Sequence, residues 1–175
     1  PSGDGTFVFA QLSKNLENAC IKARRYKLSA TRLILFLRTQ EFRDAGLEMK
    51  LSRPTAYPID LFKPLREGFE QIYRAGNRYR QTGVVLTGLV PDTTVQYTLF
   101  DDTTKIEKFS KIYSAVDKVS EKFGKYAVHH ASSLPTKLQT QHEGERGDAP
   151  QRKRELFKGE NKRQRLGLPV LNVKV

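Results

Sequence analysis

The sequence predicts an α+β domain of the split β-α-β-β-α-β kind, in which two helices cover one face of an antiparallel sheet. Two segments, 30–39 and 47–53, alternate apolar and polar residues with the period of a strand. Two others, 7–26 and 60–75, carry apolar residues at helical spacing. With one more strand at the end, the order lacks only a first strand, which we expect to precede Pro1.

The charge of the chain indicates the class of partner. Its 175 residues include 31 Lys and Arg against 19 Asp and Glu, a formal charge of +12. An excess of this size makes a polyanion the expected partner. The competing partner, an anionic membrane surface, is disfavoured because the sequence has no basic stretch with a broad apolar face. The single cysteine, Cys20, rules out an internal disulfide and suits a reducing compartment.

The first helix is predicted over 7–26, where the apolar residues form one stripe. That stripe consists of Phe9, Leu12, Leu16, Ala19, Cys20 and Ala23. Asp4 or Thr6 is placed to cap the start of this helix. Because Cys20 belongs to the stripe, we interpret it as a buried small side chain rather than a nucleophile.

The strand over 30–39 is expected at the centre of the sheet, because its alternation is strict. Its two faces are predicted to carry Leu33, Leu35 and Leu37 toward the core, and Arg32, Ile34, Phe36 and Arg38 toward an open side. We expect both guanidinium groups on the open side to meet an external anion rather than internal carboxylates.

The second strand, 47–53, is predicted to follow a turn over 41–46 and to end at Pro54. The last strand is predicted over 79–89. Its Gly83 is expected to mark a bulge that switches the alternation.

The second helix is predicted over 60–75, with Gly76 as its C-terminal stop. Pro58 marks the approach to this helix. Because Pro64 is unfavourable inside a helix, we expect the first regular turn to begin near Lys63, after an irregular stretch.

The second half of the chain changes character. We predict a helix over 105–123, a short strand over 126–130 and an irregular polar tail beyond Ser132. The predicted organisation is a domain over 1–90, a linker over 91–103, an extension over 104–131 and a basic, flexible tail over 132–175.

Three runs of the sequence resemble a known family. They are Arg32-Leu33-Ile34-Leu35-Phe36-Leu37-Arg38-Thr39, Leu51-Ser52-Arg53-Pro54-Thr55 and Gly83-Val84-Val85-Leu86-Thr87-Gly88-Leu89. In this order and spacing, residues 12–89 resemble the C-terminal little finger domain of Y-family translesion DNA polymerases, nearest the bacterial DNA polymerase IV branch. The residues from Lys105 onward resemble a tail extension that some members carry. The resemblance implies a bacterial, cytoplasmic and nucleoid-associated protein.

The resemblance also implies that the open sheet face lies across the major groove of duplex template-primer DNA and grips its phosphates. The positions that match the family's contacts are Arg32, Arg38, Thr39, Lys50, Ser52, Arg80, Gln81 and Thr87. Phosphate contacts fix the position of a protein on DNA without reading its sequence, as a lesion-tolerant enzyme requires. Ile34, Phe36 and Val85 depart from the family pattern, which more often has polar side chains there.

The run Gln96-Tyr97-Thr98-Leu99-Phe100 resembles the short peptide with which bacterial polymerases bind the β sliding clamp. We expect Leu99 and Phe100 to bury apolar surface, worth roughly 1.5–3 kcal/mol per side chain. The amide of Gln96 would bond at the rim of the clamp's pocket. The alternative is an ordinary edge segment in which both apolar side chains pack into the domain.

No catalytic or metal-binding residue is predicted in this chain. Asp101 and Asp102 are neighbours in a linker, and His129 and His130 would point to opposite sides of a strand. The resemblance implies that the catalytic carboxylates and their Mg²⁺ belong to a palm domain outside this sequence. We therefore expect an inert fragment of a DNA-directed DNA polymerase.

A stand-alone RNA-binding module with a ferredoxin-like sheet is the alternative function. Phe36 favours it, because such modules stack bases on aromatic side chains in the middle of an open sheet. The alternating glycine and aromatic pattern of those modules is missing, and the neighbouring arginines suit phosphates instead.

Overall fold

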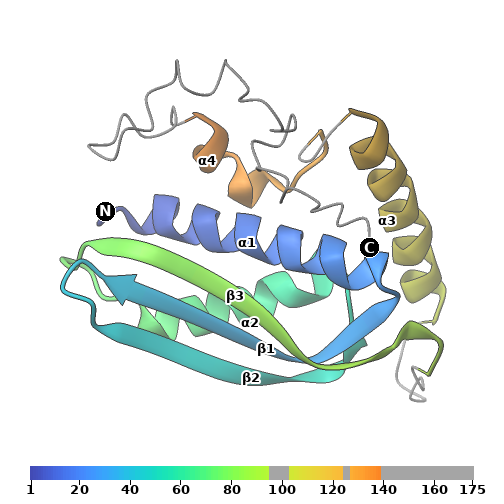
Figure 1. Cartoon of the computed structure of the whole chain (residues 1–175), viewed down its shortest axis with the longest axis horizontal. Coiled ribbons are helices and arrows are strands. Elements are labelled where there is room, and N and C mark those ends of the chain that lie inside the picture. Colours follow the sequence, from blue (N-terminus) through green and yellow to red (C-terminus); the bar gives the residue numbers. More distant parts are fainter. Residues whose placement is uncertain (95–102, 124–126, 139–175) are drawn as a thin grey trace, which may run out of the picture. The chain divides into compact units, whose positions relative to one another are not determined.

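The computed structural model describes residues 1–94, 103–123 and 127–138, and Pro1–Leu138 form one compact unit (Figure 1). The elements are α1 (Gly5–Arg25), β1 (Leu28–Thr39), β2 (Asp44–Thr55), α2 (Pro58–Ile72), β3 (Tyr79–Pro91), the 3₁₀ turn η1 (Asp92–Thr94), α3 (Thr103–Phe123), a second 3₁₀ turn η2 (Ala131–Ser133) and α4 (Pro135–Leu138). The clamp-like peptide at 96–100 and the part of the predicted 132–175 tail from 139 onward lie outside the described residues. The start of that predicted tail is not irregular, because η2 ends at the buried Ser133 and α4 follows it. The predicted domain boundaries stay a prediction.

The sheet has the order β2-β1-β3, with antiparallel pairing on both sides of the central strand β1. β2 and β3 therefore run parallel to each other on either side of β1, and α2 connects them. This is a split β-α-β unit, which confirms the predicted α+β class and the central place of β1.

The core lies between one sheet face and the two long helices. Leu33, Leu35 and Leu37 are completely buried, as predicted from their alternation. The helices α1 and α2 cover this face, contributing the fully buried Leu12, Leu16, Leu61 and Leu65 (Figure 1). Each such side chain contributes roughly 1.5–3 kcal/mol by its burial. No helix of the described residues covers the opposite sheet face.

Helix α1 begins at the predicted cap. The Asp4 carboxylate accepts a hydrogen bond from the backbone N–H of Thr6 at 2.9 Å. Cys20 is fully buried in the apolar stripe, and this burial raises the pKa of its thiol to about 12. It is therefore a small core side chain and no nucleophile.

The second strand is longer than predicted at both ends. The Thr39 N–H bonds to the Arg43 carbonyl at 2.9 Å, so β2 starts at Asp44 and the predicted turn over 41–46 is wrong in extent. The strand also continues past Pro54 to Thr55. β2 is an edge strand, where the missing N–H of a proline need not pair.

Helix α2 begins at Pro58, a first helical position that suits proline. It runs through Pro64 without interruption, so the predicted irregular start near Lys63 is wrong. An internal proline costs about 3 kcal/mol. The buried Leu61 and Leu65 on either side of it offset this cost.

Two glycines have roles other than the predicted ones. Gly76, at φ +90°, lies in the turn before β3, whereas α2 already ends at Ile72. Gly83 marks no bulge, because the pairing is regular there and shifts only beside Arg38. A Cβ on Gly83 would collide with the ring of Phe36, so the absence of a side chain at position 83 leaves the space that the ring occupies.

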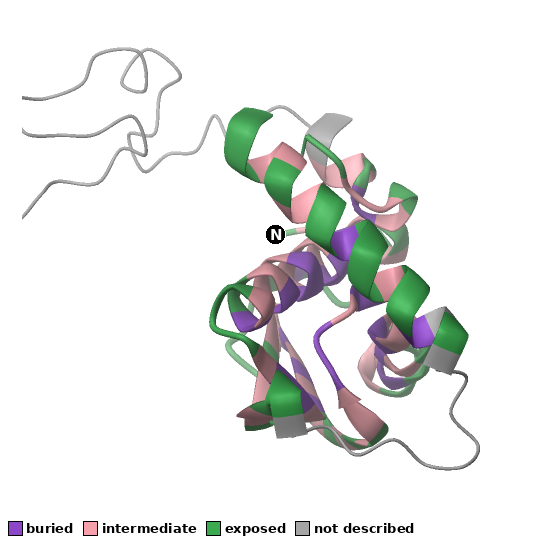
Figure 2. Ribbon diagram, turned by 90° about the vertical axis from the view of Figure 1, so that its right-hand side faces the viewer, coloured by how far each residue is buried: buried purple, intermediate pink, exposed green. Residues whose placement is uncertain are grey.

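The predicted helix over 105–123 is α3, which turns Ile106 and Tyr113 inward (Figure 2). Its apolar residues are not all buried, since Ile112 and Phe123 are 44% and 68% exposed. The predicted short strand over 126–130 is wrong where it is described, since 127–130 is irregular. No described helix is long and apolar enough to cross a membrane.

Candidate nucleic-acid interface

The open sheet face consists of four rows of side chains that run across the strands. In the order β2, β1, β3, the rows are Lys50–Arg32–Thr87, Glu48–Ile34–Val85, Gly46–Phe36–Gly83 and Asp44–Arg38–Gln81. Arg32 and Arg38 are six positions apart, which in a strand corresponds to about 20 Å. Polar rows thus flank an apolar centre.

Both central arginines are paired with carboxylates of β2. Arg38 donates two hydrogen bonds to Asp44, from Nε at 2.6 Å and from Nη2 at 2.7 Å. Arg32 Nη1 lies 3.2 Å from Glu48 Oε1. The expectation that these guanidinium groups meet no internal carboxylate is therefore wrong. The hydrogen bonds from Arg38 hold the pKa of the Asp44 carboxyl below its usual range.

These ion pairs are exposed to solvent. The Arg38 and Asp44 side chains are 37% and 52% exposed, and those of Arg32 and Glu48 are 56% and 48% exposed. Exposed ion pairs contribute little to stability because water screens them, so a phosphate can compete for either guanidinium. Lys50 has no partner among the described residues and lies opposite Arg32.

Three more predicted contact residues are accessible. Ser52 and Gln81 are exposed, and Gln81 pairs with Arg38 across the sheet. Arg80 is exposed too, with its guanidinium 4.2 Å from the ring centre of Phe42. These side chains extend the polar surface along both edges of the sheet.

Two other predicted contact residues have little access to solvent. Thr39 is 8% exposed, and its Oγ1 accepts a hydrogen bond from the Arg43 N–H at 3.2 Å within the hairpin. The Thr87 hydroxyl is shielded and has no hydrogen-bond partner among the described residues. The accessible surface is therefore smaller than the predicted one.

The sequence prediction missed two residues of this surface, Asp44 and Glu48, which pair with the central arginines. Both come from the hairpin register, which places Asp44 directly opposite Arg38. A prediction with a shorter turn, in which β2 starts at Asp44, places Asp44 opposite Arg38. The sequence therefore contains the information for this pair, but it can be used only when the length of the turn is known.

A second cluster joins the extension to the domain. Arg24 binds Asp117 of α3 through Nε at 2.7 Å and Nη2 at 2.6 Å, and also donates to the Ala56 carbonyl at 2.9 Å. The ring of Tyr113 stacks on that of Tyr57 with centres 5.4 Å apart. These contacts hold α3 beside the start of α2.

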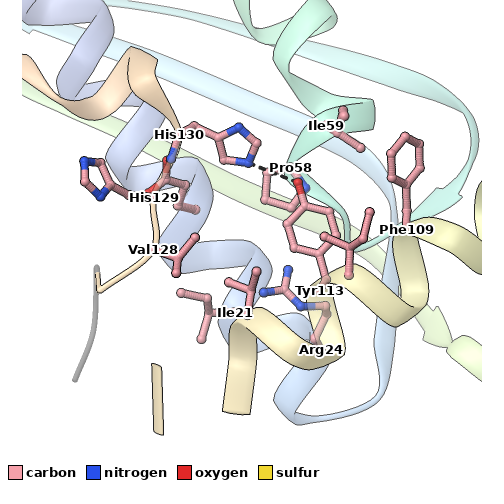
Figure 3. A pocket seen from close by; sticks show the side chains of 12 residues that line it. Ile21, Arg24, Pro58, Ile59, Phe109, Tyr113, Val128, His129 and His130 are labelled. Atoms are coloured by element: carbon pink, nitrogen blue, oxygen red, sulfur yellow. Dashed lines mark hydrogen bonds between the residues drawn. The ribbon is translucent and has the colours of Figure 1, made fainter. Parts of the chain in front are cut away.

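The segment before η2 joins the same cluster. The buried Glu17 accepts hydrogen bonds from the His130 N–H at 2.9 Å and from Ser133 Oγ at 3.0 Å. The His130 Nε2 lies 3.0 Å from the Tyr113 hydroxyl (Figure 3). Burial raises the pKa of Tyr113 to about 12 and lowers that of His130.

A pocket of about 260 Å³ opens between these elements (Figure 3). Its walls are mainly apolar and include Ile21, Ile59, Phe109 and Val116. The polar groups at its edge, Glu17, Arg24 and Tyr113 among them, already have protein partners. Among the described residues, no three His, Cys, Asp or Glu side chains gather as a metal site.

Comparison with known proteins identifies the family. The model of the impB/mucB/samB family C-terminal domain matches residues 6–99, more than half of the chain. The DNA polymerase IV of Moorella thermoacetica is 29% identical over 122 residues, which cover 68% of this chain. The chain spans about 30% of the length of that relative. Both findings favour the C-terminal domain of this polymerase family over a stand-alone RNA-binding module. The chain belongs to the impB/mucB/samB C-terminal domain family and is a little finger domain of the Y-family DNA polymerases.

Proposed function

We propose that this chain binds template-primer DNA and the β sliding clamp as the C-terminal region of a translesion DNA polymerase. The observation that carries the proposal is the sheet face over which no described helix lies, with Arg32 and Lys50 at one end and Arg38 at the other. The separation of about 20 Å exceeds the width of the major groove, about 12 Å, so the two ends can reach phosphates on opposite strands.

On binding, a DNA phosphate would replace the carboxylate that pairs with each arginine in the free chain. A phosphate offers the guanidinium the same bidentate geometry as a carboxylate does. Ile34, Phe36 and Val85 would face the groove between the gripped strands without reading base edges. Such contacts tolerate altered bases, because the phosphate spacing survives most lesions.

Catalysis belongs to the remainder of the proposed parent enzyme, a DNA-directed DNA polymerase. The Mg²⁺ required for phosphoryl transfer would neutralise charge on the phosphates there. The described residues offer no donor set that fits this ion. The role of this chain is to hold the duplex while the template passes.

The clamp-binding part of the proposal rests on Gln96, Leu99 and Phe100. The chain enters this stretch from β3 through η1 and leaves it into α3. Apolar anchors beside an amide follow the common pattern of peptide recognition.

Titration of labelled duplex DNA at several salt concentrations tests the DNA-binding part. Arg32→Ala and Arg38→Ala should each weaken binding regardless of sequence and lower the salt slope by about 1. Arg66→Ala is the matched control, since Arg66 lies on α2 with its guanidinium over the Phe9 ring. Tight single-stranded RNA binding that Phe36→Ala abolishes would support the RNA-binding module instead.

Binding of a 94–102 peptide to a β sliding clamp tests the second part. Gln96→Ala, Leu99→Ala and Phe100→Ala should each weaken binding, whereas Thr98→Ala at a variable position should not. Equal affinity of all four variants would refute clamp binding and leave the DNA-binding proposal untouched.

A further inference from the structure

An exposed phenylalanine stands at the tip of the β1–β2 hairpin. Phe42 is 66% exposed and has φ +64°, in the left-handed region that bulky residues rarely adopt. The turn contains Gln40, Glu41 and Phe42, closed by the Phe42 N–H to the Thr39 carbonyl at 3.1 Å. In three-residue hairpin loops this last position normally holds glycine or asparagine. This turn therefore has an exposed aromatic side chain at a position where glycine or asparagine is usual.

The side chain of Arg80, on β3, packs against the Phe42 ring. Its guanidinium carbon lies 4.2 Å from the ring centre of Phe42, within the range of a cation–π contact. The β3 register shifts at this point, between the partners of Arg38 and Thr39. The Gln40 N–H also bonds to the Arg78 carbonyl at 2.8 Å, which fixes the hairpin tip to the start of β3.

The tip is continuous with the proposed DNA surface. Gln81, next to Arg80 in the chain, is the cross-strand partner of Arg38. The residues around the tip include four arginines against two carboxylates, namely Arg38, Arg43, Arg78 and Arg80 against Glu41 and Asp44. A positive surface with an exposed ring is the common composition of a single-stranded DNA site.

We propose that Phe42, supported by Arg80, stacks on an unpaired base of the DNA strand that continues beyond the duplex held on the open sheet face. The inference rests on the proposed DNA binding and extends it to a second ligand element, a single-stranded overhang. Stacking on an aromatic ring accepts every base, since each has a π face.

The test uses the full 175-residue chain and two DNAs, a blunt duplex and the same duplex with a 5′ overhang. A 2-aminopurine at the first unpaired position reports stacking through fluorescence quenching. The wild type should bind the overhang DNA about tenfold more tightly than the blunt one, as base stacking of typical strength gives. Phe42→Asn, which suits the turn, should abolish this preference and the quenching, and Phe42→Tyr should retain both.

A matched control separates this ring from aromatic residues in general. Phe123 is 68% exposed and lies beneath a cation as well, with Lys122 Nζ 5.3 Å from its ring centre. Phe123→Ala should leave the overhang preference unchanged. The inference is overturned if blunt and overhang DNA bind equally to the wild type, or if Phe42→Asn weakens both equally. In either case duplex binding would persist, whereas a chain that binds neither DNA overturns the proposed function as well.

Discussion

The guanidinium of Arg38 and the carboxylate of Asp44 face each other across β1 and β2 and share two hydrogen bonds of 2.6 and 2.7 Å. In the proposed DNA complex, a pair of phosphate oxygens would take the position of this carboxylate. The carboxylate would therefore compete with DNA, while in the free chain it holds the guanidinium fork in an orientation suited to an anion.

Asp44→Asn should strengthen DNA binding, because it removes the competing charge while leaving an acceptor for Arg38. We expect roughly three- to tenfold tighter duplex binding at low salt and a salt slope steeper by up to about 0.9. Fluorescence anisotropy over a salt series measures both. Glu67→Gln makes the same charge change on α2, and an equal gain there would mean that net charge alone matters.

Asp117→Ala should release α3 from the domain. It leaves the Arg24 side chain, 11% exposed, with the Ala56 carbonyl and the Tyr113 ring as its remaining partners among the described residues. Loss of one partner of a largely buried pair costs about 2–4 kcal/mol. Hydrogen exchange should speed up in α3 and stay slow in β1. Glu121→Ala, at an exposed site of the same helix, should change neither, and comparable exchange in both variants would contradict the role of the pair.

Docking of the segment around His130 should weaken in mild acid. Burial first, and then the neighbouring His129, lowers the pKa of His130 below the usual value of about 6.5. As the pH falls, the undocked imidazole therefore takes up a proton before the docked one. The stability that docking of His130 contributes is complete above about pH 6.5 and is lost as the pH falls toward the folded-state pKa. Hydrogen exchange in 127–133 between pH 7 and 5 measures the effect. His130→Gln should remove it and His129→Gln should not; the reverse result would disprove the assignment.

Phe42→Asn should leave the fold as stable or make it more stable. Asparagine tolerates a positive φ, and relief of the left-handed strain offsets the lost cation–π contact, for a gain of up to about 1 kcal/mol. Urea unfolding measures the difference. Gln40→Asn, in the same turn but without a positive φ, should give no gain. A clear loss of stability in Phe42→Asn would show that the ring supports the hairpin instead.

The alternation of residues 30–39 was enough to assign Leu33, Leu35 and Leu37 to the core, because side-chain direction in a strand follows from local geometry alone. The stripe of the first helix and the proline at the start of the second were local signals of the same kind. The family resemblance of residues 12–89, too, was readable from the order of three short runs.

The partners of the surface charges were decided only by the tertiary structure. Arg38 meets Asp44 because the hairpin turn is short, and Arg24 meets Asp117 across 93 positions of sequence. Phe36 fits because Gly83 lies beside it on the neighbouring strand. Local periodicity fixes which way a side chain points, whereas register and long-range packing fix what it meets there.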